Sequence, residues 1–582
     1  MDLFDILALV GGLALFLFGM QLMGNALEKK AGGSLKNILE KMTDSKLKGF
    51  LLGMLVTCVI QSSSATTVMV VGFVNSGIMK LRQAISIIMG ANIGTTITAW
   101  ILSLTGVSGD AWYIQLFKPS SFVPVLALIG VIFYIFLNDH KKKDTGVILL
   151  GFATLMTGME AMSDAVAGLK DVPAFANILT LFTNPILGVL AGAVLTAVIQ
   201  SSSASVGILQ ALSSTGAISF GAAVPIIMGQ NIGTCATALL SCIGANKNAK
   251  RTAFVHLYFN VIGTVVLLTV FSIAKAALNL YYLDSIAIDG FWIAVVHSAF
   301  NIVCTVLWFP FTSLLEKLAC ITVRDTEEKE HYEMLDERLF ATPAVAVNRS
   351  KDVTVKMAEI AANSIRESFK LLNNFDAAAA DKIIADESKV DKYEDKLGSY
   401  LVKVSALGLN DSDTAETTKL LHIISDFERI SDHAVNIVQS AEEINAKKIE
   451  FSGSAKNELA VMINAVSEIL DLAFDSFVNQ NLKSATLVEP LEEVIDELRE
   501  EIKGRHIKRL QKGECTIELG FVLSDILTNL ERIADHCSNI AGCMLEMSLG
   551  DLEIHKYLRQ LKDGSHEEFK KLFVSYTEKY SI

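Results

Sequence analysis

Proline and cysteine are scarce in this sequence, and their scarcity excludes several classes of protein. The 582 residues include 8 prolines, too few for a long proline-rich or disordered segment. The 8 cysteines contain no Cys-x-x-Cys pair, so their spacing fits neither a disulfide framework nor a zinc site. We expect them to be small core residues of a protein in a reducing compartment.

Charge is missing from much of the first half of the chain. Residues 1–320 carry 18 Lys+Arg and 14 Asp+Glu, and the stretches 49–79, 83–109 and 172–246 carry none. The remaining residues carry 32 basic and 49 acidic side chains. This division excludes a single water-soluble domain, and the acidic balance argues against nucleic-acid binding.

Several apolar stretches are long enough to cross the ~30 Å hydrocarbon core of a bilayer. Lysines cluster after the first and third of them, and basic residues also follow the fifth. Placing these clusters in the cytoplasm puts the N-terminus outside and the acidic half inside the cell. We therefore expect a multi-pass protein of the bacterial inner membrane. The seven stretches are residues 3–23, 82–105, 121–138, 145–165, 219–244, 252–275 and 288–315.

Two further apolar stretches, residues 49–77 and 185–216, do not fit as crossings because polar residues break each of them midway. As crossings, they would place Lys80 and Arg82 outside the cell. As re-entrant hairpins, they keep every basic cluster inside. Irregular backbone is tolerated at membrane depth where protein surrounds it or where it lines a watery cavity. We predict two re-entrant hairpins.

The two hairpin stretches are copies of one another at an offset of 139 residues. TCVIQSSSATTVMVVGFVNSG (57–77) and TAVIQSSSASVGILQALSSTG (196–216) are identical at 9 of 21 positions. MGANIGTTITA (89–99) and MGQNIGTCATA (228–238) keep the offset, with 8 of 11 identities. Each copy holds three crossings, an odd number, so the second copy must be inverted in the membrane. Inverted repeats that meet at broken helices are typical of secondary transporters.

The polar residues of the two copies can bind ions without carrying charge. Hydroxyls, amides and the N–H groups that begin a half-helix suit an oxyanion, whereas hydroxyl and carbonyl oxygens suit Na⁺. A multiply charged anion would be poorly solvated there, and bound sodium would offset its charge. In the alternative interpretation, the hydroxyls only bond to the preceding turn or join helices. The candidates are Gln61, Ser62, Ser63, Ser64, Thr66, Asn92, Thr95, Thr96, Gln200, Ser201, Ser202, Ser203, Ser205, Asn231 and Thr234.

Two histidines of the apolar half also belong to matching segments. His256 and His297 begin HLYFN and HSAFN, so each shares a helix face with an asparagine four residues later. We interpret them as residues that join helices near the hairpins, with proton linkage as the alternative.

The doubled QSSS hairpins and the G-x-N-I-G-T segments that follow them resemble the type II sodium/phosphate cotransporters. The resemblance covers about residues 1–315. It implies Na⁺-coupled transport of inorganic phosphate, with both ligands held between the two QSSS regions. Some bacterial relatives are associated with phosphate efflux, so the direction stays open. The matching positions are Gln61–Ser64, Asn92, Thr95, Gln200–Ser203, Asn231 and Thr234.

The acidic half contains a second internal repeat. DFERISDHAVNI (426–437) and NLERIADHCSNI (529–540) are offset by 103 residues, and residues 387–397 resemble residues 492–502. About 100 residues accommodate three helices with short loops. We predict two three-helix bundles in tandem.

Each copy of this repeat places the pattern Glu-x-x-x-Asp on two helices, which would gather four carboxylates for a hard or transition metal. In the alternative, Arg429 and Arg532 form ion pairs on a solvated face. These segments, about residues 340–550, resemble PhoU, a phosphate-signalling helical protein whose family binds metal clusters. The resemblance implies a divalent or iron-type metal. The candidates are Glu387, Asp391, Glu428, Asp432, Glu492, Asp496, Glu531 and Asp535.

The expected fold is all-α. A polytopic membrane domain, residues 1–318, would hold repeat one at about 1–140, repeat two at about 141–275 and a final crossing at 288–315. A linker helix at 319–345 would lead to a cytoplasmic PhoU-like domain at 346–550, with bundles at about 346–450 and 453–550. Residues 551–582 would form a further helix.

Two classes of function remain open. One is a sodium-coupled phosphate transporter that the PhoU-like domain regulates. The other is a membrane-anchored phosphate receptor that moves nothing, and an exporter of phosphate or a related oxyanion is a further alternative. We do not expect an enzyme, because no Walker loop or catalytic triad is present. Expected partners are phosphate, sodium and the lipid bilayer, together with a second copy of the chain or a cytoplasmic regulator, and no nucleic acid.

Overall fold

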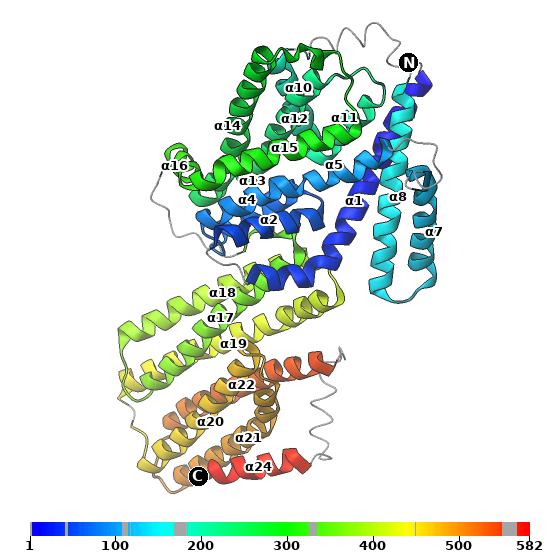
Figure 1. The fold of residues 1–582 in the computed structure, drawn as a ribbon. Helices are drawn as coiled ribbons and strands as arrows, with labels where there is room; N and C mark the ends of the chain where they lie inside the picture. The colour runs from blue at the N-terminus through cyan, green and yellow to red at the C-terminus, as the bar shows by residue number, and fades with distance from the viewer. Residues whose placement is uncertain are drawn as a thin grey trace. The chain divides into compact units, whose positions relative to one another are not determined.

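The computed structural model describes residues 3–40, 45–106, 118–167, 184–324, 335–448, 450–549 and 567–582, together with residues 115, 116 and 182. The chain divides into two compact units, Met1–Val345 and Ala346–Ile582. The regular elements of the described residues are helices (Figure 1), and one isolated β-bridge joins Ser219 and Ala287. The expected all-α fold is confirmed.

The first unit contains both membrane repeats. Repeat one comprises α1 (Leu3–Glu40), α2 (Lys46–Ile60), α3 (Ser63–Asn75), α4 (Leu81–Gly94), α5 (Thr96–Ser103), η1 (Leu104–Gly106) and α7 (Pro119–Phe136). Repeat two comprises α8 (His140–Val166), α10 (Pro185–Ile199), α11 (Ser202–Ser213), α12 (Phe220–Gly233), α13 (Cys235–Ser241) and α14 (Lys247–Ala277). The unit then continues through η3 (Leu280–Asp284), α15 (Gly290–Trp308), η4 (Phe309–Phe311), α16 (Thr312–Thr322) and η5 (Glu337–Ala341).

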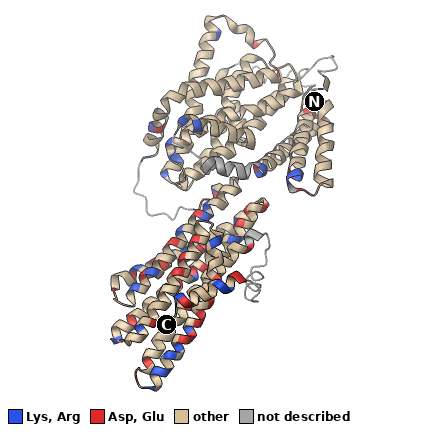
Figure 2. Cartoon of the chain, turned by 60° about the horizontal axis from the view of Figure 1, so that its bottom comes forward, with Lys and Arg blue, Asp and Glu red and all other residues tan. Residues whose placement is uncertain are grey.

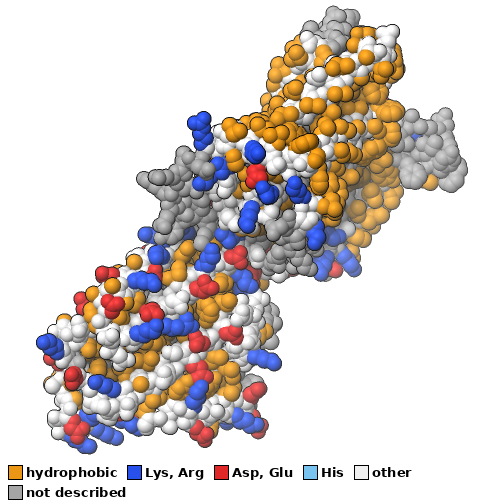
Figure 3. All heavy atoms as spheres, turned by 60° about the vertical axis from the view of Figure 1, so that its left-hand side comes forward, with side chains coloured by type: hydrophobic (Ala, Val, Ile, Leu, Met, Phe, Trp, Pro, Cys, Tyr) orange, Lys and Arg blue, Asp and Glu red, His pale blue; other side chains and the backbone are white. Residues whose placement is uncertain are grey.

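Seven helical segments of the described residues are long and apolar enough to cross a membrane, and they coincide with the seven predicted stretches. Hydrophobic side chains cover much of the visible surface of the first unit (Figure 3), whereas charged residues are frequent along the helices of the second unit (Figure 2). The segments are Phe4–Lys30, Leu81–Gly106, Pro119–Phe136, Lys141–Val166, Phe220–Ser241, Lys247–Ala277 and Gly290–Thr322.

Helices α1 and α8 hold equivalent places in the two repeats and pack against each other in opposite directions. A β-carbon at Gly12 would lie 3.1 Å from the carbonyl oxygen of Gly158, and one at Gly19 would lie 2.7 Å from that of Gly151. The offset of 139 residues relates Gly12 to Gly151 and Gly19 to Gly158, so the two contacts are equivalent under the repeat. Repeat two is therefore inverted relative to repeat one, as predicted.

Close packing against glycine also shows the path of the first hairpin. A β-carbon at Gly49 would lie 3.2 Å from Cβ of Ser86, and one at Gly94 would lie 2.7 Å from Cβ of Thr57. A residue further toward the C-terminus of α2 therefore contacts a residue further toward the C-terminus of α4, so the two helices run parallel. Because only five residues separate α3 from α4, α3 must carry the chain back alongside α2. Helices α2 and α3 form the predicted re-entrant hairpin.

The second hairpin has the same arrangement. A β-carbon at Gly188 would lie 3.0 Å from Cβ of Pro225, and one at Gly233 would lie 2.6 Å from Cβ of Thr196. Helices α10 and α12 therefore run parallel, so α11, which connects them in sequence, must run in the opposite direction. Small residues allow this close approach of helix backbones in membranes.

The second unit is a pair of three-helix bundles. The first contains α17 (Pro343–Leu371), α18 (Ala377–Ser405) and α19 (Asp411–Lys447), and the second contains α20 (Gly453–Val478), α21 (Leu482–Gln511) and α22 (Ile517–Leu549). Both kinds of charge are spread along these helices (Figure 2). Helix α24 (Glu567–Lys579) lies in the predicted tail helix, 551–582. Residues 551–566 of that tail and 325–334 of the predicted linker helix lie outside the described residues.

The two bundles meet through equivalent residues of α19 and α22. His433 Nδ1 lies 2.8 Å from Asn529 Oδ1, and His536 Nδ1 lies 3.0 Å from Asp426 Oδ1. The two imidazole rings stack with their centroids 5.6 Å apart. The histidines of the repeated motif therefore join the bundles to each other.

Candidate ion-binding site

Each hairpin turns at a glutamine with a left-handed backbone. Helix α2 ends at Gln61 with φ 60°, and α10 ends at Gln200 with φ 58°. Residues other than glycine seldom adopt this conformation, which costs about 1–2 kcal/mol. The N–H groups of the two glutamines donate to the carbonyls of Thr57 and Thr196, at 2.8 and 2.7 Å. Both repeats therefore keep the same strained turn.

The first serine of each QSSS motif caps the returning half-helix. The Oγ atoms of Ser62 and Ser201 accept hydrogen bonds from the N–H groups of Ala65 and Ala204, each at 3.2 Å. Helices α3 and α11 thus begin directly after the turn, and their first N–H groups face the hairpin tip. Such N–H groups, together with the helix dipole, form an anion-binding end.

The two hairpin tips lie against each other. Ser64 Oγ donates a hydrogen bond to the carbonyl oxygen of Gln200 at 3.5 Å, across 136 residues of sequence. Ser63 and Ser202, at equivalent positions, are each 4% exposed. The structure therefore brings the two predicted QSSS regions to one place.

The predicted residues of the G-x-N-I-G-T segments lie buried on the helices packed beside the tips. Asn92 and Asn231 donate to carbonyls of their own helices at 3.1 and 2.8 Å. The hydroxyls of Thr95, Thr96 and Thr234 do the same, at 3.2, 2.8 and 2.6 Å. Their hydrogens are used within the helix, but the oxygen lone pairs can still accept hydrogen bonds or bind a cation.

The side chains around the first tip are joined by hydrogen bonds. Thr98 Oγ1 donates to Gln61 Oε1 at 2.8 Å, and Thr57 Oγ1 donates to Thr66 Oγ1 at 3.0 Å. Gln61 is only 8% exposed as a result. Neither Thr57 nor Thr98 was predicted, although both are conserved between the two copies of the repeat, as Thr196 and Thr237.

The second tip lacks these bonds. Gln200 is exposed, and Thr237 Oγ1 donates to the carbonyl of Thr234 within its own helix at 2.9 Å. The hydroxyls of Thr196 and Ser205, which correspond to the bonded pair of the first tip, are buried and have no hydrogen-bond partner among the described residues. The two tips share a backbone and differ in how their side chains are held.

Helices α14 and α15 border the second repeat with buried polar residues. Asn301 Nδ2 donates to Asn231 Oδ1 at 3.2 Å, and Asn260 Nδ2 contacts Cys235 Sγ at 3.4 Å. His256 and His297 lie one turn before these asparagines and are fully buried. The asparagines therefore join helices, and Asn301 adds a contact to the predicted site. Among the described residues, both ring nitrogens of His297 and Nδ1 of His256 have no hydrogen-bond partner, so the joining role predicted for the histidines is not seen.

The acidic residues of the first bundle gather between α18 and α19. The pKa of Glu428 is raised to about 7, first by burial and then by the nearby carboxylates of Asp432, Glu394 and Asp391. Glu394, one turn after Asp391, was not predicted, whereas the predicted Glu387 contacts its neighbour Ser388 at 3.3 Å. This group of carboxylates has the donor set that a hard or transition metal requires.

The second bundle has a cation in the corresponding place. Arg499 Nη1 lies 2.5 Å from Glu531 Oε1, and Arg499 is also close to Asp496. Burial raises the pKa of Asp535, and the carboxylates of Glu531 and Asp496 add to the rise. Because 105 residues separate Asp391 from Asp496 and Glu394 from Arg499, the arginine replaces an acid of the first bundle. The second group therefore fits a metal less well than the first.

Glu492, the remaining predicted ligand of the second bundle, lies in another acidic group. Glu489, Glu492 and Glu493 each have one carboxylate oxygen that lies within 4.8 Å of those of the other two. Ser538 Oγ donates to Glu489 Oε2. The four predicted ligands of this bundle therefore do not form one group. Asp496, Glu531 and Asp535 belong to the group that contains Arg499, and Glu492 belongs to the separate cluster.

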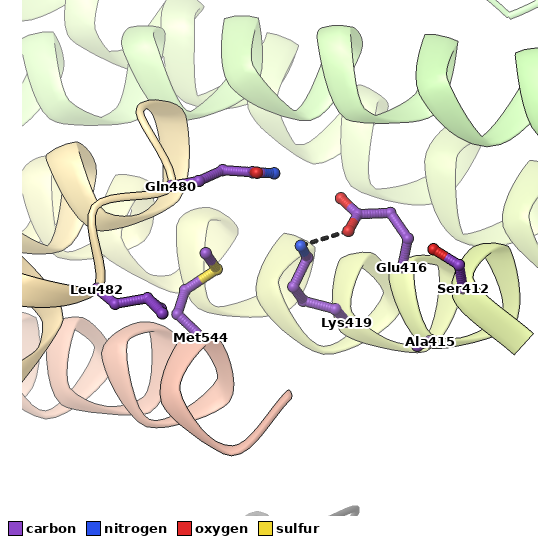
Figure 4. Close-up of a pocket in the computed structure, with 7 residues that line it drawn as sticks. All are labelled: Ser412, Ala415, Glu416, Lys419, Gln480, Leu482 and Met544. Carbon is purple, nitrogen blue, oxygen red and sulfur yellow. Dashed lines mark hydrogen bonds and ion pairs between the residues drawn. The ribbon is translucent and has the colours of Figure 1, made fainter. Parts of the chain in front are cut away.

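A cavity of about 430 Å³ lies in the second unit beside α19 (Figure 4). Lys419, 6% exposed, forms an ion pair of 2.5 Å with Glu416 at its wall. Since this pair neutralises itself, the cavity offers no net charge to select an ion. Its lining residues are Ser412, Ala415, Glu416, Lys419, Gln480, Leu482 and Met544.

Comparison with known proteins places both halves of the chain in families. The Na⁺/Pi-cotransporter model matches residues 15–164 and 167–285, and the PhoU domain model matches residues 354–441 and 459–544. The "Uncharacterized protein YqeW" of Bacillus subtilis is 30% identical over 305 residues, which cover 52% of this chain and 93% of YqeW.

Two other relatives carry functional names. The "Putative inorganic phosphate export protein YjbB" of Escherichia coli K12 is 24% identical over 558 residues, which cover 93% of this chain and 97% of YjbB. The "Sodium-dependent phosphate transport protein 2A" of Rattus norvegicus is 27% identical over 175 residues, which cover 30% of this chain and 26% of the rat protein.

The inverted hairpin repeats and the tandem bundles define a multi-span membrane protein of the phosphate transporter class with a PhoU-like regulatory domain. Within that class, the chain belongs to the Na⁺/Pi-cotransporter family, as the doubled QSSS motif predicts.

Proposed function

We propose that this protein is a sodium-coupled secondary transporter of inorganic phosphate. In this proposal, access to the site alternates between the two sides of the membrane as the inverted repeats exchange conformations. The observation that carries the proposal is the contact between Ser64 and the carbonyl of Gln200. It brings the positive ends of two half-helices to one charge-free site.

Phosphate would bind between the hairpin tips. The first N–H groups of α3 and α11 and the hydroxyls of Ser63, Ser64 and Ser202 would donate to its oxygens, as neutral donors do in other anion sites. Because the QSSS segments contain no charged residue, the protein itself does not compensate the charge of the anion. Sodium binding next to the anion would supply that compensation and couple the two fluxes.

The direction of transport and the orientation of the chain belong to the proposal. Basic clusters place the N-terminus outside and the PhoU-like domain in the cytoplasm. The name of YjbB favours export, and the name of the rat protein favours sodium dependence. An exporter of phosphate is therefore the second candidate, with the same site and the opposite net flux.

The 3₁₀ turn η5 offers a route for regulation. Asn75 Nδ2, at the end of α3, donates to Asp336 Oδ2 at 2.7 Å, and Arg338 Nε donates to the carbonyl of Ser241 at 2.5 Å. Thr342 contacts Met69 Sδ of α3 at 3.0 Å and is followed directly by α17. A movement of α17 would thus pull on the returning half of the first hairpin.

In the PhoU-like domain, we propose a metal between α18 and α19 of the first bundle. Asp391, Glu394, Glu428 and Asp432 would hold it, and the cation would supply positive charge that ties α18 to α19. Arg499 supplies such a charge in the second bundle. The domain would then report phosphate status through η5.

The test of transport is uptake of radiolabelled phosphate into proteoliposomes that contain the full chain. An inward sodium gradient should drive accumulation, and an equal potassium gradient should not. Sodium-independent accumulation would remove the coupling from the proposal. Absence of flux in both directions would favour the receptor.

A double variant separates the transporter from the receptor. Ser63→Ala with Ser202→Ala should abolish flux, because both are buried serines of the QSSS motifs that would donate to phosphate in this proposal. The phosphate-dependent signalling of the cell should survive this change if signalling needs the PhoU-like domain alone. Arg338→Ala should change regulation and leave the site intact, with the exposed Arg324→Ala as its control.

A further inference from the structure

We propose that His297 binds a proton when phosphate occupies the site between the hairpin tips and releases it when phosphate leaves. This proposal rests on the proposed transport of phosphate and adds H⁺ to the ions that take part in it. His297 lies in α15, outside the two repeats and outside the predicted ion-binding residues, and its side chain is fully buried.

The imidazole of His297 has no partner for either of its ring nitrogens in the described part of the chain. A neutral imidazole carries one donor and one acceptor, and burial of both without a hydrogen bond is costly. Native structures therefore almost always supply a partner for such groups, from the protein or from water. Since the described residues supply none, we assign the ring to contacts with water and with a proton.

Two further polar groups continue the same face of α15. Asn301 Oδ1 and Thr305 Oγ1 are also buried, and the described residues give neither of them a hydrogen-bond partner. Side chains four residues apart on a helix are about 5–6 Å from each other. One water molecule bridges that span with two hydrogen bonds of about 2.8 Å. Water would thus connect His297 to Thr305 along ~12 Å of α15, and relays of this kind carry protons inside membranes.

The polar face of α15 contacts the predicted site on the side of repeat two. Asn301 Nδ2 donates to Oδ1 of Asn231 at 3.2 Å. Asn231 belongs to the second G-x-N-I-G-T segment and is a predicted site residue. His297 lies one turn before Asn301, so a proton bound there is one helical turn from a residue that touches the site.

The same part of α15 also contacts repeat one. Ser298, the residue after His297, accepts a hydrogen bond from Trp100 Nε1 of α5 at 2.9 Å. Two residues before Trp100, Thr98 donates to Gln61 at the first hairpin tip. His297 therefore lies between contacts that lead to the two repeats, where the charge of a proton acts on an anion between their tips.

The elements packed against α15 contain no acidic residue that could neutralise an imidazolium. Its main packing partners are α4, α5, α11, α12, α14, η1 and η4, and none of them contains Asp or Glu. An isolated buried charge is costly, so a protonated ring requires an anion nearby. Phosphate is the anion that the proposed function brings, so the proton and phosphate each favour the binding of the other. The titratable and basic groups on these elements and on α15 itself are Arg82, Lys247, Lys250, Arg251, His256, Tyr258, Lys275 and Cys304.

Helix α14 repeats the spacing His-x-x-x-Asn-x-x-x-Thr at residues 256–264. Thr264 Oγ1 donates to the carbonyl of Met228 at 3.4 Å, and Asn260 Nδ2 contacts Cys235 Sγ instead of a predicted site residue. The row on α14 therefore ends on an acceptor of the protein, whereas the row on α15 ends on a hydroxyl without a described partner. His256 is thus the matched control for His297.

The first test counts the protons taken up when inorganic phosphate binds to the purified full chain. Titration calorimetry at about pH 7 and constant sodium, in buffers of different ionisation enthalpy, gives this number. His297→Gln should lower it by about one proton per phosphate, because glutamine keeps polar groups but does not titrate. His256→Gln should leave it at the wild-type value. Any change in the ionisation of phosphate itself enters all three measurements equally.

The second test follows phosphate flux in proteoliposomes that enclose a pH-sensitive dye. At equal phosphate flux, vesicles with His297→Gln should move about one proton fewer per phosphate than vesicles with the wild type. Equal melting temperatures of variant and wild type would show that the fold is kept. His297→Asn, which also cannot titrate, gives an independent reading if His297→Gln does not fold.

The outcomes separate this proposal from the proposed function. A proton count that falls in His297→Gln alone would support the proton site. An unchanged count in the folded variant, with normal phosphate flux, would overturn the proton site and keep the phosphate transporter. An equal loss in His256→Gln would overturn the assignment to α15. A wild type that neither binds nor moves phosphate would overturn the proposed function together with the proton that depends on it.

Discussion

The two hairpins have the same backbone, yet their side chains are held differently. At the first tip, Gln61 is 8% exposed and accepts a hydrogen bond from Thr98. At the second, Gln200 is exposed, and the described part of the chain offers no hydrogen-bond partner to the hydroxyl of Thr196. The shared motif therefore determines the turn, and the packed neighbours determine whether the tip is closed. The proposed alternating access would need the two repeats to adopt different conformations at the same time.

The two bundles differ in a second manner. Their helices and their stacked histidines are equivalent, but Glu394 of the first bundle is replaced by Arg499 in the second. The hairpins meet at one site, so both copies are needed there. Each bundle has its own acidic group, so the replacement of an acid by Arg499 in the second bundle leaves the carboxylates of the first bundle unchanged.

The largest effect should come from the glycines that the two hairpins share. A β-carbon at Gly53 would lie 2.0 Å from the carbonyl oxygen of Ile87, and one at Gly192 would lie 2.1 Å from that of Ile226. Gly53→Ala and Gly192→Ala should therefore destabilise the protein equally, by about 3 kcal/mol, the upper end of the usual range for overpacking. Thermal unfolding in detergent measures this.

The control for this prediction is Gly11→Ala, since no atom lies within 4 Å of a β-carbon there. It should melt at the wild-type temperature or slightly above it. A Gly192 variant as stable as the control would show that the second hairpin is not packed as the first one is.

The next effect concerns the bundles, where exchange of one charge should change the number of metals bound. Arg499→Glu should add one metal per chain, because it restores the acid of the first bundle. Glu394→Arg should remove one metal per chain. Elemental mass spectrometry of the purified chain gives both counts relative to the wild type. An unchanged metal count in Arg499→Glu would contradict the assigned role of Arg499.

A smaller effect should separate the two hairpin tips. Thr98→Val removes the donor to Gln61 and leaves a buried acceptor unsatisfied, which costs about 1–3 kcal/mol. Phosphate flux should fall about 10-fold, which corresponds to ~1.4 kcal/mol. Thr237→Val removes only a bond within its own helix and should change flux by less than twofold. Equal losses in the two variants would contradict the difference between the tips.

The smallest effect should be the same in both hairpins. Ser62→Ala and Ser201→Ala each remove one capping hydrogen bond of 3.2 Å, so each should lower stability by about 1 kcal/mol. Unfolding in denaturant is the measurement, and Ser→Thr at the same positions should recover most of the loss. Unequal effects would show that one of the caps is held by other contacts.

Much of the fold could be predicted from local patterns. The apolar stretches and the odd number of crossings predicted the inverted repeats, and the polar breaks at QSSS predicted the hairpins that the glycine contacts of α2 and α10 confirm. The site was predicted in part, because Thr98 lies outside the QSSS motif and only its repetition as Thr237 sets it apart from an ordinary polar residue in an apolar helix. Arg499 was missed as well, since an arginine three residues after an Asp can point to solvent or to another helix.

By itself, the sequence determined where helices begin, break and repeat, because capping, periodicity and charge act over a few neighbouring residues. Only the tertiary structure decided which polar groups meet. Ser64 and Gln200 lie 136 residues apart, and Thr98 reaches Gln61 across 37. Such contacts depend on how whole helices pack. Close packing against glycine fixes which helices are neighbours, and thereby which side chains can meet.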